Sequence, residues 1–140
     1  YIKNTESLIS TNITNFGSKY DFFEVNSNET LYEAKHILKN RILDYHIQNG
    51  VNIEDKQSTF IDAEVVIESG AKIEHNTTLV GQTYIGQTYI GKNCTIEPNS
   101  VIKDSVVSDN CVVKCSYIEQ SRISENMIVG PFEKIINKSN

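Results

Sequence analysis

Apolar residues in the second half of the chain recur at every sixth position. From Ile61 the sequence divides into IDAEVV, IESGAK, IEHNTT and LVGQTY, and further on into IGKNCT, IEPNSV, VSDNCV, ISENMI and VGPFEK. The first place of each unit is Ile, Leu or Val, and the fifth is usually small. Neither the helical period nor the alternation of a strand gives this pattern. It predicts a solenoid in which each unit is one short strand, with the first and fifth places pointing inward.

The segment before the repeats has the pattern of one long helix. Ser27 and Asn28 supply an N-cap, and an acid follows in the first turn, where the helix dipole favours it. Gly50 stands where a left-handed C-cap would end the helix. We therefore expect a helix over residues 29–49, preceded by a short strand in KYDFFEV, which ends at Val25. One apolar stripe should be buried, formed by Leu31, Ala34, Leu38, Ile42 and Tyr45.

Charge and cysteine content exclude several classes of function. The net charge is -5 and no Lys/Arg run occurs, which argues against nucleic acid or an anionic membrane as a partner. No basic segment is followed by an apolar run, so we expect no signal peptide and no membrane span. Three cysteines without C-x-x-C spacing favour reduced thiols in a cytoplasmic protein. Cys111 and Cys115 lack the second pair that a zinc site needs.

The sequence shows no evident group of catalytic residues. His75 occupies the third place of its unit and should point outward, without a carboxylate or nucleophile partner that the sequence identifies. His36 and His46 lie on the helix and are interpreted as packing or surface groups. Acids at second places, such as Asp62 and Glu68, recur with the repeat, so we interpret them as turn and surface residues.

The pentapeptide GQTYI occurs twice in succession, from Gly81 to Ile90. Removing one copy leaves LVGQTY followed directly by IGKNCT, an unbroken run of hexads. We therefore expect the additional residues to be absorbed at a corner of the solenoid or as an added strand. No helix follows the two glycines, so the doubling does not predict a phosphate-binding nest.

The helix and the first repeats resemble the domain junction of the GlmU family, bifunctional N-acetylglucosamine-1-phosphate uridylyltransferases and glucosamine-1-phosphate N-acetyltransferases. The matching pieces are Val25-Asn26, Leu31 to Ala34, Arg41 to Val51, Phe60 to Ala63 and Val129 to Phe132. The resemblance implies a mostly β fold, a left-handed parallel β-helix of hexapeptide repeats preceded by a strand and one long α-helix. The left hand is an exception to the usual crossover rule and comes from the family alone.

The same resemblance implies a division of the chain. Residues 1–50 would be the C-terminal remnant of a nucleotidyltransferase domain with its connecting helix. Residues 51–60 would be a linker, 61–136 the coils of the β-helix and 137–140 a tail.

The family synthesises UDP-N-acetylglucosamine for the cell wall, using Mg²⁺ in uridylyl transfer and acetyl-CoA as co-substrate in acetyl transfer. The resemblance implies a cytoplasmic homotrimer, joined through the β-helix, that acts on small-molecule sugar phosphates. Asn26 aligns with an asparagine that helps to coordinate Mg²⁺, and an amide oxygen suits this cation. A turn residue ahead of the helix cap is an equally compatible interpretation of Asn26.

The family's catalytic histidine and its helper residues would lie beyond Asn140, so no catalytic residue is assigned and substrate-binding residues stay unknown. We therefore expect the chain alone to be a trimerising scaffold without either complete active site. Two alternatives stay open. One is a small hexapeptide-repeat acyltransferase, and the other is a noncatalytic interaction module.

Overall fold

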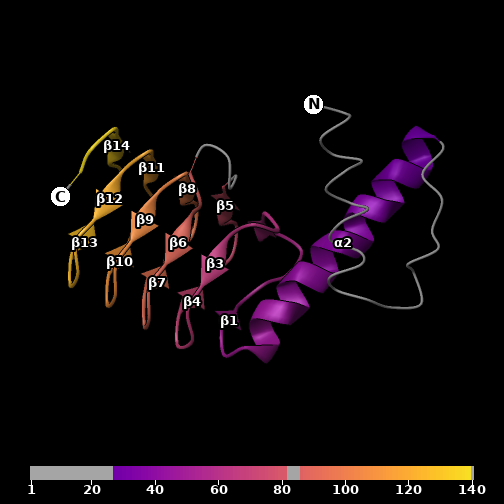
Figure 1. The fold of residues 1–140 in the computed structure, drawn as a ribbon, viewed down its shortest axis with the longest axis horizontal. Helices are drawn as coiled ribbons and strands as arrows, with labels where there is room; N and C mark the ends of the chain where they lie inside the picture. Colours follow the sequence, from indigo (N-terminus) through magenta and orange to yellow (C-terminus); the bar gives the residue numbers. More distant parts are fainter. Residues whose placement is uncertain (1–26, 82–85, 140) are drawn as a thin grey trace.

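A computed structural model of the chain describes residues 27–81 and 86–139, and Figure 1 shows one helix at the end of a three-sided coil of short strands. The expected strand in KYDFFEV and the candidate ligand Asn26 lie outside the described residues. The remaining architecture is that of a parallel β-solenoid, as the six-residue period predicts.

Helix α2 (Asn28–Gln48) begins and ends close to the expected positions. The Ser27 side chain accepts a hydrogen bond from the Thr30 amide at 3.2 Å, and the Thr30 hydroxyl accepts one from the Ser27 amide, which completes a capping box. Asn49 is the C-cap, and Gly50 follows with a φ of +92°. The buried residues of α2 are Ala34, Leu38, Ile42, Leu43 and His46.

The buried stripe of α2 differs from the prediction at its C-terminal end. Tyr45 was expected inside, but 49% of its surface is exposed, and its neighbour His46 is buried instead. Leu43 is buried as well, so the stripe has rotated by one position toward the C-terminus. The side of the helix that meets the first coil decides this rotation, and the spacing of apolar residues alone allows either choice.

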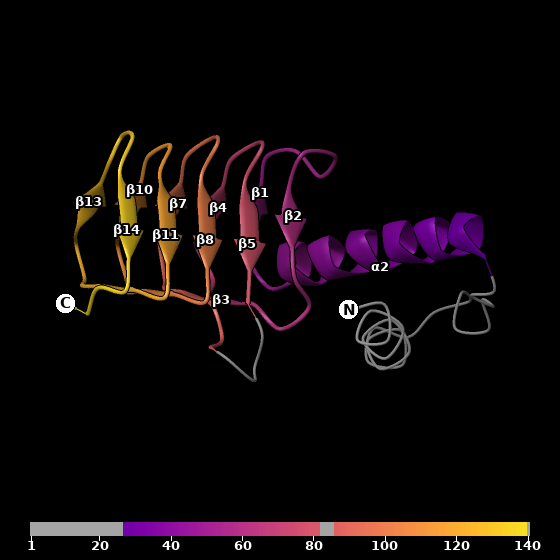
Figure 2. The same cartoon turned by 90° about the horizontal axis from the view of Figure 1, so that it is seen from above.

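Three parallel sheets form the walls of the solenoid. The strands are β1 (Asn52–Ile53), β2 (Phe60–Ile61), β3 (Val66–Ile67), β4 (Lys72–Ile73), β5 (Thr78–Val80), β6 (Tyr89–Ile90), β7 (Thr95–Ile96), β8 (Val101–Lys103), β9 (Val106–Val107), β10 (Val112–Val113), β11 (Tyr117–Glu119), β12 (Arg122–Ile123), β13 (Ile128–Val129) and β14 (Lys134–Ile136). The first sheet has the order β1-β4-β7-β10-β13, the second β14-β11-β8-β5-β2 and the third β12-β9-β6-β3. The views in Figures 1 and 2 together show that the coil is left-handed.

The register of the sheets stacks aliphatic side chains inside the prism. In each strand the first residue faces outward and the second inward, as when Lys72 and Ile73 pair with Thr95 and Ile96. The inward columns are Ile73, Ile96, Val113 and Val129 in the first sheet, Ile61, Leu79, Ile102, Ile118 and Ile135 in the second, and Ile67, Ile90, Val107 and Ile123 in the third. Each such side chain contributes about 1.5–3 kcal/mol when it is fully buried.

Asparagine residues shape the corners between the sheets. The residue before the small inward place has a positive φ in most units, for example 57° at Asn93 and 60° at Asn110. Asparagine adopts this left-handed conformation more readily than other residues with a Cβ. Shorter units place Asp104, Cys115 or Gln120 there, again directly before a small residue. Units of five and six residues therefore turn the chain with the same local geometry.

The first coil begins earlier than the hexads suggest. Strand β1 lies inside the segment 51–60 that the sequence analysis interprets as a linker, and it pairs in parallel with β4. The segment therefore contains the first strand of the first sheet, followed by a connection to β2. Val51-Asn52-Ile53-Glu54 carries no small residue at the expected place, so the hexad pattern does not reveal this strand.

The additional residues of the doubled pentapeptide, which we call the excursion, are inserted at one corner of the coil, between β5 and β6. Thr78 follows its register partner Phe60 by 18 residues, whereas Val101 follows its partner Thr78 by 23 residues. The two sides of the excursion meet at Gly81, where an added Cβ would lie 2.7 Å from the amide nitrogen of Thr88. Beyond Thr88, Tyr89 resumes the register opposite Val66. Absorption of the additional residues at a corner is thus confirmed.

Deletion of residues 82–86 should leave the fold intact, because it restores an unbroken hexad between β5 and β6. We expect an unchanged circular dichroism spectrum and a Tm that is the same or slightly higher. A shorter loop costs less closure entropy, and the resulting gain in the free energy of unfolding should be less than about 1 kcal/mol. Deletion of residues 97–101, which removes five residues from an unbroken part of the coil, is the matched control and should abolish cooperative unfolding. Equal damage by both deletions would contradict the corner assignment.

Candidate functional site

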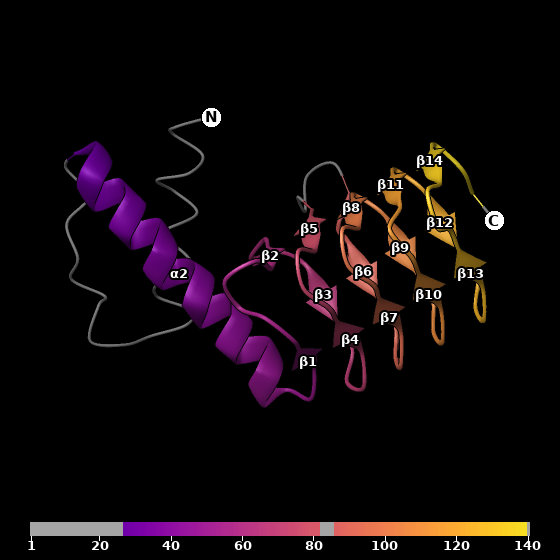
Figure 3. The ribbon, with the colours of Figure 1, turned by 180° about the vertical axis from the view of Figure 1, so that it is seen from behind.

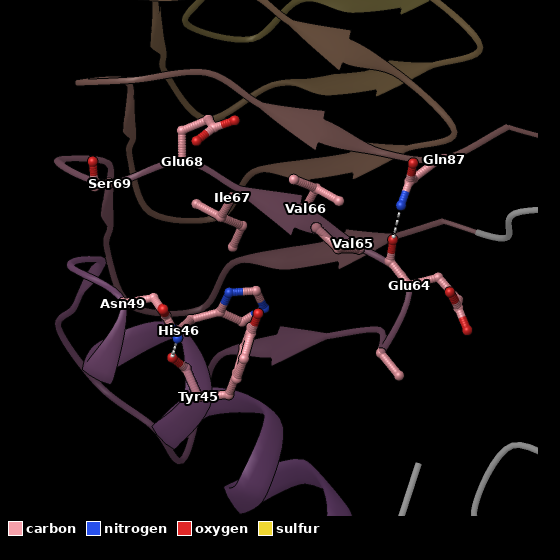
Figure 4. A pocket seen from close by; sticks show the side chains of 11 residues that line it. Tyr45, His46, Asn49, Glu64, Val65, Val66, Ile67, Glu68, Ser69 and Gln87 are labelled. Atoms are coloured by element: carbon pink, nitrogen blue, oxygen red, sulfur yellow. Dashed lines mark hydrogen bonds between the residues drawn. The ribbon is translucent and has the colours of Figure 1, made fainter. Parts of the chain in front are cut away.

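A cleft of about 650 Å³ lies between the C-terminal end of α2 and the first coils of the solenoid. Its lining consists of Tyr45, His46 and Asn49 from the helix, residues 63–69 around β3, and Gln87 from the base of the excursion (Figure 4). Helix and solenoid are held together beside it. Lys56 Nζ lies 2.7 Å from Asp44 Oδ1, and Lys39 Nζ donates to the carbonyl of Gln57 at 2.8 Å.

His46 is the most deeply buried polar residue of the cleft. Only 4% of its surface is exposed, and the Tyr45 ring lies edge-on to it with 5.4 Å between the ring centroids. Its backbone carbonyl accepts hydrogen bonds from Asn49 and Val51. Burial lowers the pKa of His46 to about 4. The imidazole is therefore neutral at neutral pH and offers one donor and one acceptor.

Three other polar side chains of the cleft form hydrogen bonds within the protein. Gln87 Nε2 donates to the carbonyl of Glu64 at 2.9 Å, and Asn49 Nδ2 donates to the carbonyl of Tyr45 at 2.6 Å. Glu68 accepts a hydrogen bond from the Tyr89 hydroxyl at 3.2 Å. The described lining of the cleft contains two carboxylates and no Lys or Arg, so this lining is negatively charged and rich in acceptors.

His75 has a carboxylate partner that the sequence analysis did not identify. Its Nδ1 forms a short contact with Glu54 Oε1, and the same oxygen accepts the backbone N–H of His75 at 3.1 Å. These hydrogen bonds lower the pKa of the Glu54 carboxyl. The two residues are 21 positions apart but lie at the same corner of successive coils, and only the pairing of β1 with β4 brings them together. The pair is solvent-exposed and lies outside the cleft.

Asp62 closes the base of the excursion. Its Oδ2 accepts a hydrogen bond from the Gly81 amide at 3.2 Å. Burial raises the pKa of Asp62, and the negative charges of Asp104 and Glu64 act in the same direction, whereas the Gly81 hydrogen bond opposes the shift. Asp62 is therefore a half-buried structural residue and not the plain surface acid that its place in the hexad predicts.

The cysteines fill the core. Cys94 and Cys111 are buried at successive corners, where their thiols donate to the carbonyls of Ser108 at 3.0 Å and Ser124 at 2.9 Å. Burial raises the pKa of both thiols. Within residues 27–81 and 86–139, no three or more His, Cys, Asp or Glu residues are grouped so that they could hold a metal ion. No helix in this part of the chain is long and apolar enough to cross a membrane.

Sequence comparison relates the chain to known proteins. No protein-family model matches it. It is 39% identical over 119 residues to the bifunctional protein GlmU of Caldanaerobacter subterraneus subsp. tengcongensis, covering 85% of this chain and 25% of the relative. GlmU of Clostridium beijerinckii is 42% identical over 111 residues, covering 79% and 23%. GlmU of Enterococcus faecalis is 38% identical over 115 residues, covering 82% and 24%.

The chain thus spans about a quarter of the length of the curated relatives it matches, and the resemblance to GlmU proposed from the junction residues is confirmed. Among solved structures, serine acetyltransferase isoform 3 from Entamoeba histolytica in complex with cysteine matches with a TM-score of 0.29 and 14% identity, over 96% of this chain and 58% of that chain. A likeness at this level carries no argument about function.

The buried His46 should make stability depend on pH between about 4 and its ordinary pKa of 6.5. In this window the unfolded chain binds a proton that the folded chain excludes, so the free energy of unfolding falls as the pH falls, by about 2 kcal/mol at pH 5. This contribution to stability is fully present above pH 6.5. Urea unfolding measures the difference in the free energy of unfolding between pH 7.5 and pH 5.0. This difference should be smaller for His46→Gln than for the parent chain. An equal difference in both proteins would show that His46 is protonated when folded.

The hydrogen bonds from His75 should account for the low pKa of Glu54. In His75→Ala the pKa of Glu54 should rise toward its ordinary value, because the side-chain hydrogen bond is the largest cause of the shift and is lost. The backbone hydrogen bond is retained, so the return is partial. Carboxyl-carbon NMR titration measures this pKa directly, and Asp62, whose raised pKa has no contribution from His75, is the control and should keep its pKa in the variant.

Proposed function

We propose that this chain is part of a GlmU-like enzyme of UDP-N-acetylglucosamine synthesis, in which it forms the trimerising β-helical scaffold. The proposal is supported by its similarity to a segment that makes up about a quarter of the length of the GlmU proteins. The extent and identity of the sequence matches support this function over a separate small acyltransferase or an unrelated interaction module. The enzyme would be cytoplasmic, would act on sugar phosphates, and would serve cell-wall synthesis.

The groups that such an enzyme uses fit this chain to different degrees. Asn26 would contribute an amide oxygen to Mg²⁺, whose other ligands would come from elsewhere in the enzyme. The cleft beside α2 does not fit acetyl-CoA, because Glu64 and Glu68 line it and no Lys or Arg is present to meet the phosphates. On this proposal the chain supplies structure to the enzyme, and the cleft beside α2 is not its acetyl-donor site.

The proposal of a trimer is supported by the residues on the outward faces of the sheets. The outward column of the second sheet contains Phe60, Val101 and Tyr117, and that of the third contains Val66, Tyr89 and Val106. Phe60 and Val66 are 50% and 37% exposed. The first sheet instead presents Asn52, Lys72 and Thr95 in its first three strands. Two different apolar faces on one protomer are what a closed ring with head-to-tail interfaces requires, because each copy contacts its two neighbours through different surfaces.

Light scattering after gel filtration should give a mass three times the 15.8 kDa of one chain. Val101→Lys combined with Tyr117→Lys should produce a folded monomer, because two charges would be buried at the second-sheet interface. Thr95→Lys with Val112→Lys, on the first sheet of the same coils, is the matched control and should leave the trimer intact. A monomeric parent chain, or equal effects of the two variants, would contradict the proposed arrangement.

A further inference from the structure

The helix covers the first coil unequally. Helix α2 packs against β1 and β2, the terminal strands of the first two sheets, each of which has five strands. The third sheet has four strands and ends at β3, and the cleft lies between β3 and the end of α2. Figure 3 shows the third sheet ending short of the helix. The cleft therefore occupies the place where a fifth strand of the third sheet would lie.

The edge of β3 that faces this place has unpaired backbone groups. Val66 and Glu68 donate their N–H groups to Thr88 and Ile90, at 3.0 and 2.9 Å on the β6 side. Successive residues of a strand direct their hydrogen-bonding groups to opposite sides, so Ile67, between them, directs its N–H and C=O away from β6. No residue of α2 pairs with the backbone of Ile67.

The next coil shows what is missing at Ile67. In the third sheet Ile67 occupies the place in β3 that Ile90 occupies in β6, because the two residues are register partners. The carbonyl of Ile90 accepts the N–H of Glu68 from the preceding coil. A strand added along β3 would donate to the carbonyl of Ile67 in the same way. Unpaired edges of this kind are sites where extended chains add to a sheet.

The side chains of the cleft restrict which chain would fit. His46 is only 4% exposed, and its ring lines the cleft beside β3 (Figure 4). Glu64 and Glu68 lie four residues apart on either side of β3, and no Lys or Arg is among the described residues that line the cleft with them. The C-terminal end of α2 adds partial negative charge. Exposed Tyr45 and Val66 offer apolar surface between these groups.

We propose that the cleft binds an extended peptide segment of a partner protein that contains lysine or arginine and pairs with the free edge of β3 as an added strand. Its backbone would satisfy Ile67, and its basic side chains would pair with Glu64 and Glu68. Glu64, Val66 and Glu68 share one face of the strand, so an apolar residue between the two basic ones, on the same face of the segment, would pack on Val66 beside Tyr45. Val66 also belongs to the outward column of the third sheet that the proposed trimer uses. The two proposals are nevertheless tested separately, because the trimer is tested by variants of the second sheet and the peptide by variants of Glu64 and Glu68.

Amide hydrogen exchange by NMR tests the free edge in the 140-residue chain itself. The amides of Val66 and Glu68 should be protected, whereas that of Ile67 should exchange at least tenfold faster. Addition of the probe peptide acetyl-Lys-Val-Val-Val-Lys-amide, whose lysines have the four-residue spacing of Glu64 and Glu68, should slow exchange at Ile67 and leave the other two amides unchanged. Protection of Ile67 in the free chain, whether from its own residues or from a second copy, would overturn the proposal.

Calorimetric titration with matched peptides separates strand addition from attraction between opposite charges. A peptide with the same sequence and N-methyl groups on alternate residues keeps its charge but loses backbone donors, and it should bind at least tenfold more weakly. Replacement of lysine by glutamate in the peptide should abolish binding. If N-methylation does not weaken binding, the proposed strand pairing is wrong.

Protein variants locate the binding surface. Glu64→Gln combined with Glu68→Gln should weaken binding of the lysine peptide at least threefold. Glu97→Gln combined with Glu125→Gln removes the same charge from other corners and should leave the affinity unchanged. Equal weakening by the two double variants would show that the peptide binds to the overall negative charge of the chain, and the cleft would then lose its assignment.

Discussion

The stacking of each coil on the next is the interaction on which the rest of the structure depends. A single triangular coil encloses only three inward strand side chains and cannot shield them from water along the solenoid axis. Ile73 becomes fully buried because Ile96 lies directly above it in register, and Val113 then covers Ile96. A shift of register in one coil would therefore expose side chains in its two neighbours as well.

This dependence explains why the doubled pentapeptide is tolerated. Additional residues within a strand would reverse inward and outward places for everything that follows. At the corner Gly81 lies against Thr88, which is buried at the small place, so the strands on both sides keep their partners. The corners with a positive φ also keep the strands in register, because units of five and of six residues turn the chain with the same local geometry.

The sequence contains most of the information for the coil and much less for its contacts. Ile61 and the hexads after it predict the strands, their inward places and the corners, since all three repeat locally. The asparagine at fourth places was a further available signal of the left-handed corners. The pairing of His75 with Glu54 and the burial of His46 in place of Tyr45 depend on how separate elements dock. No local pattern encodes that choice, because the same helix spacing permits either rotation.

The end of a solenoid needs a cover, and the form of that cover has consequences for the cleft. A helix is roughly cylindrical, about 10 Å across, and cannot lie along all three sides of a triangular coil at once. Helix α2 covers β1 and β2, and in doing so it buries His46 beside the third side. The unpaired edge of β3 and the neutral imidazole thus have a common geometric origin: a straight element closes a three-sided structure. Any molecule that fills the remaining side must supply the hydrogen bonds of a strand and be narrow enough to lie between β3 and the helix.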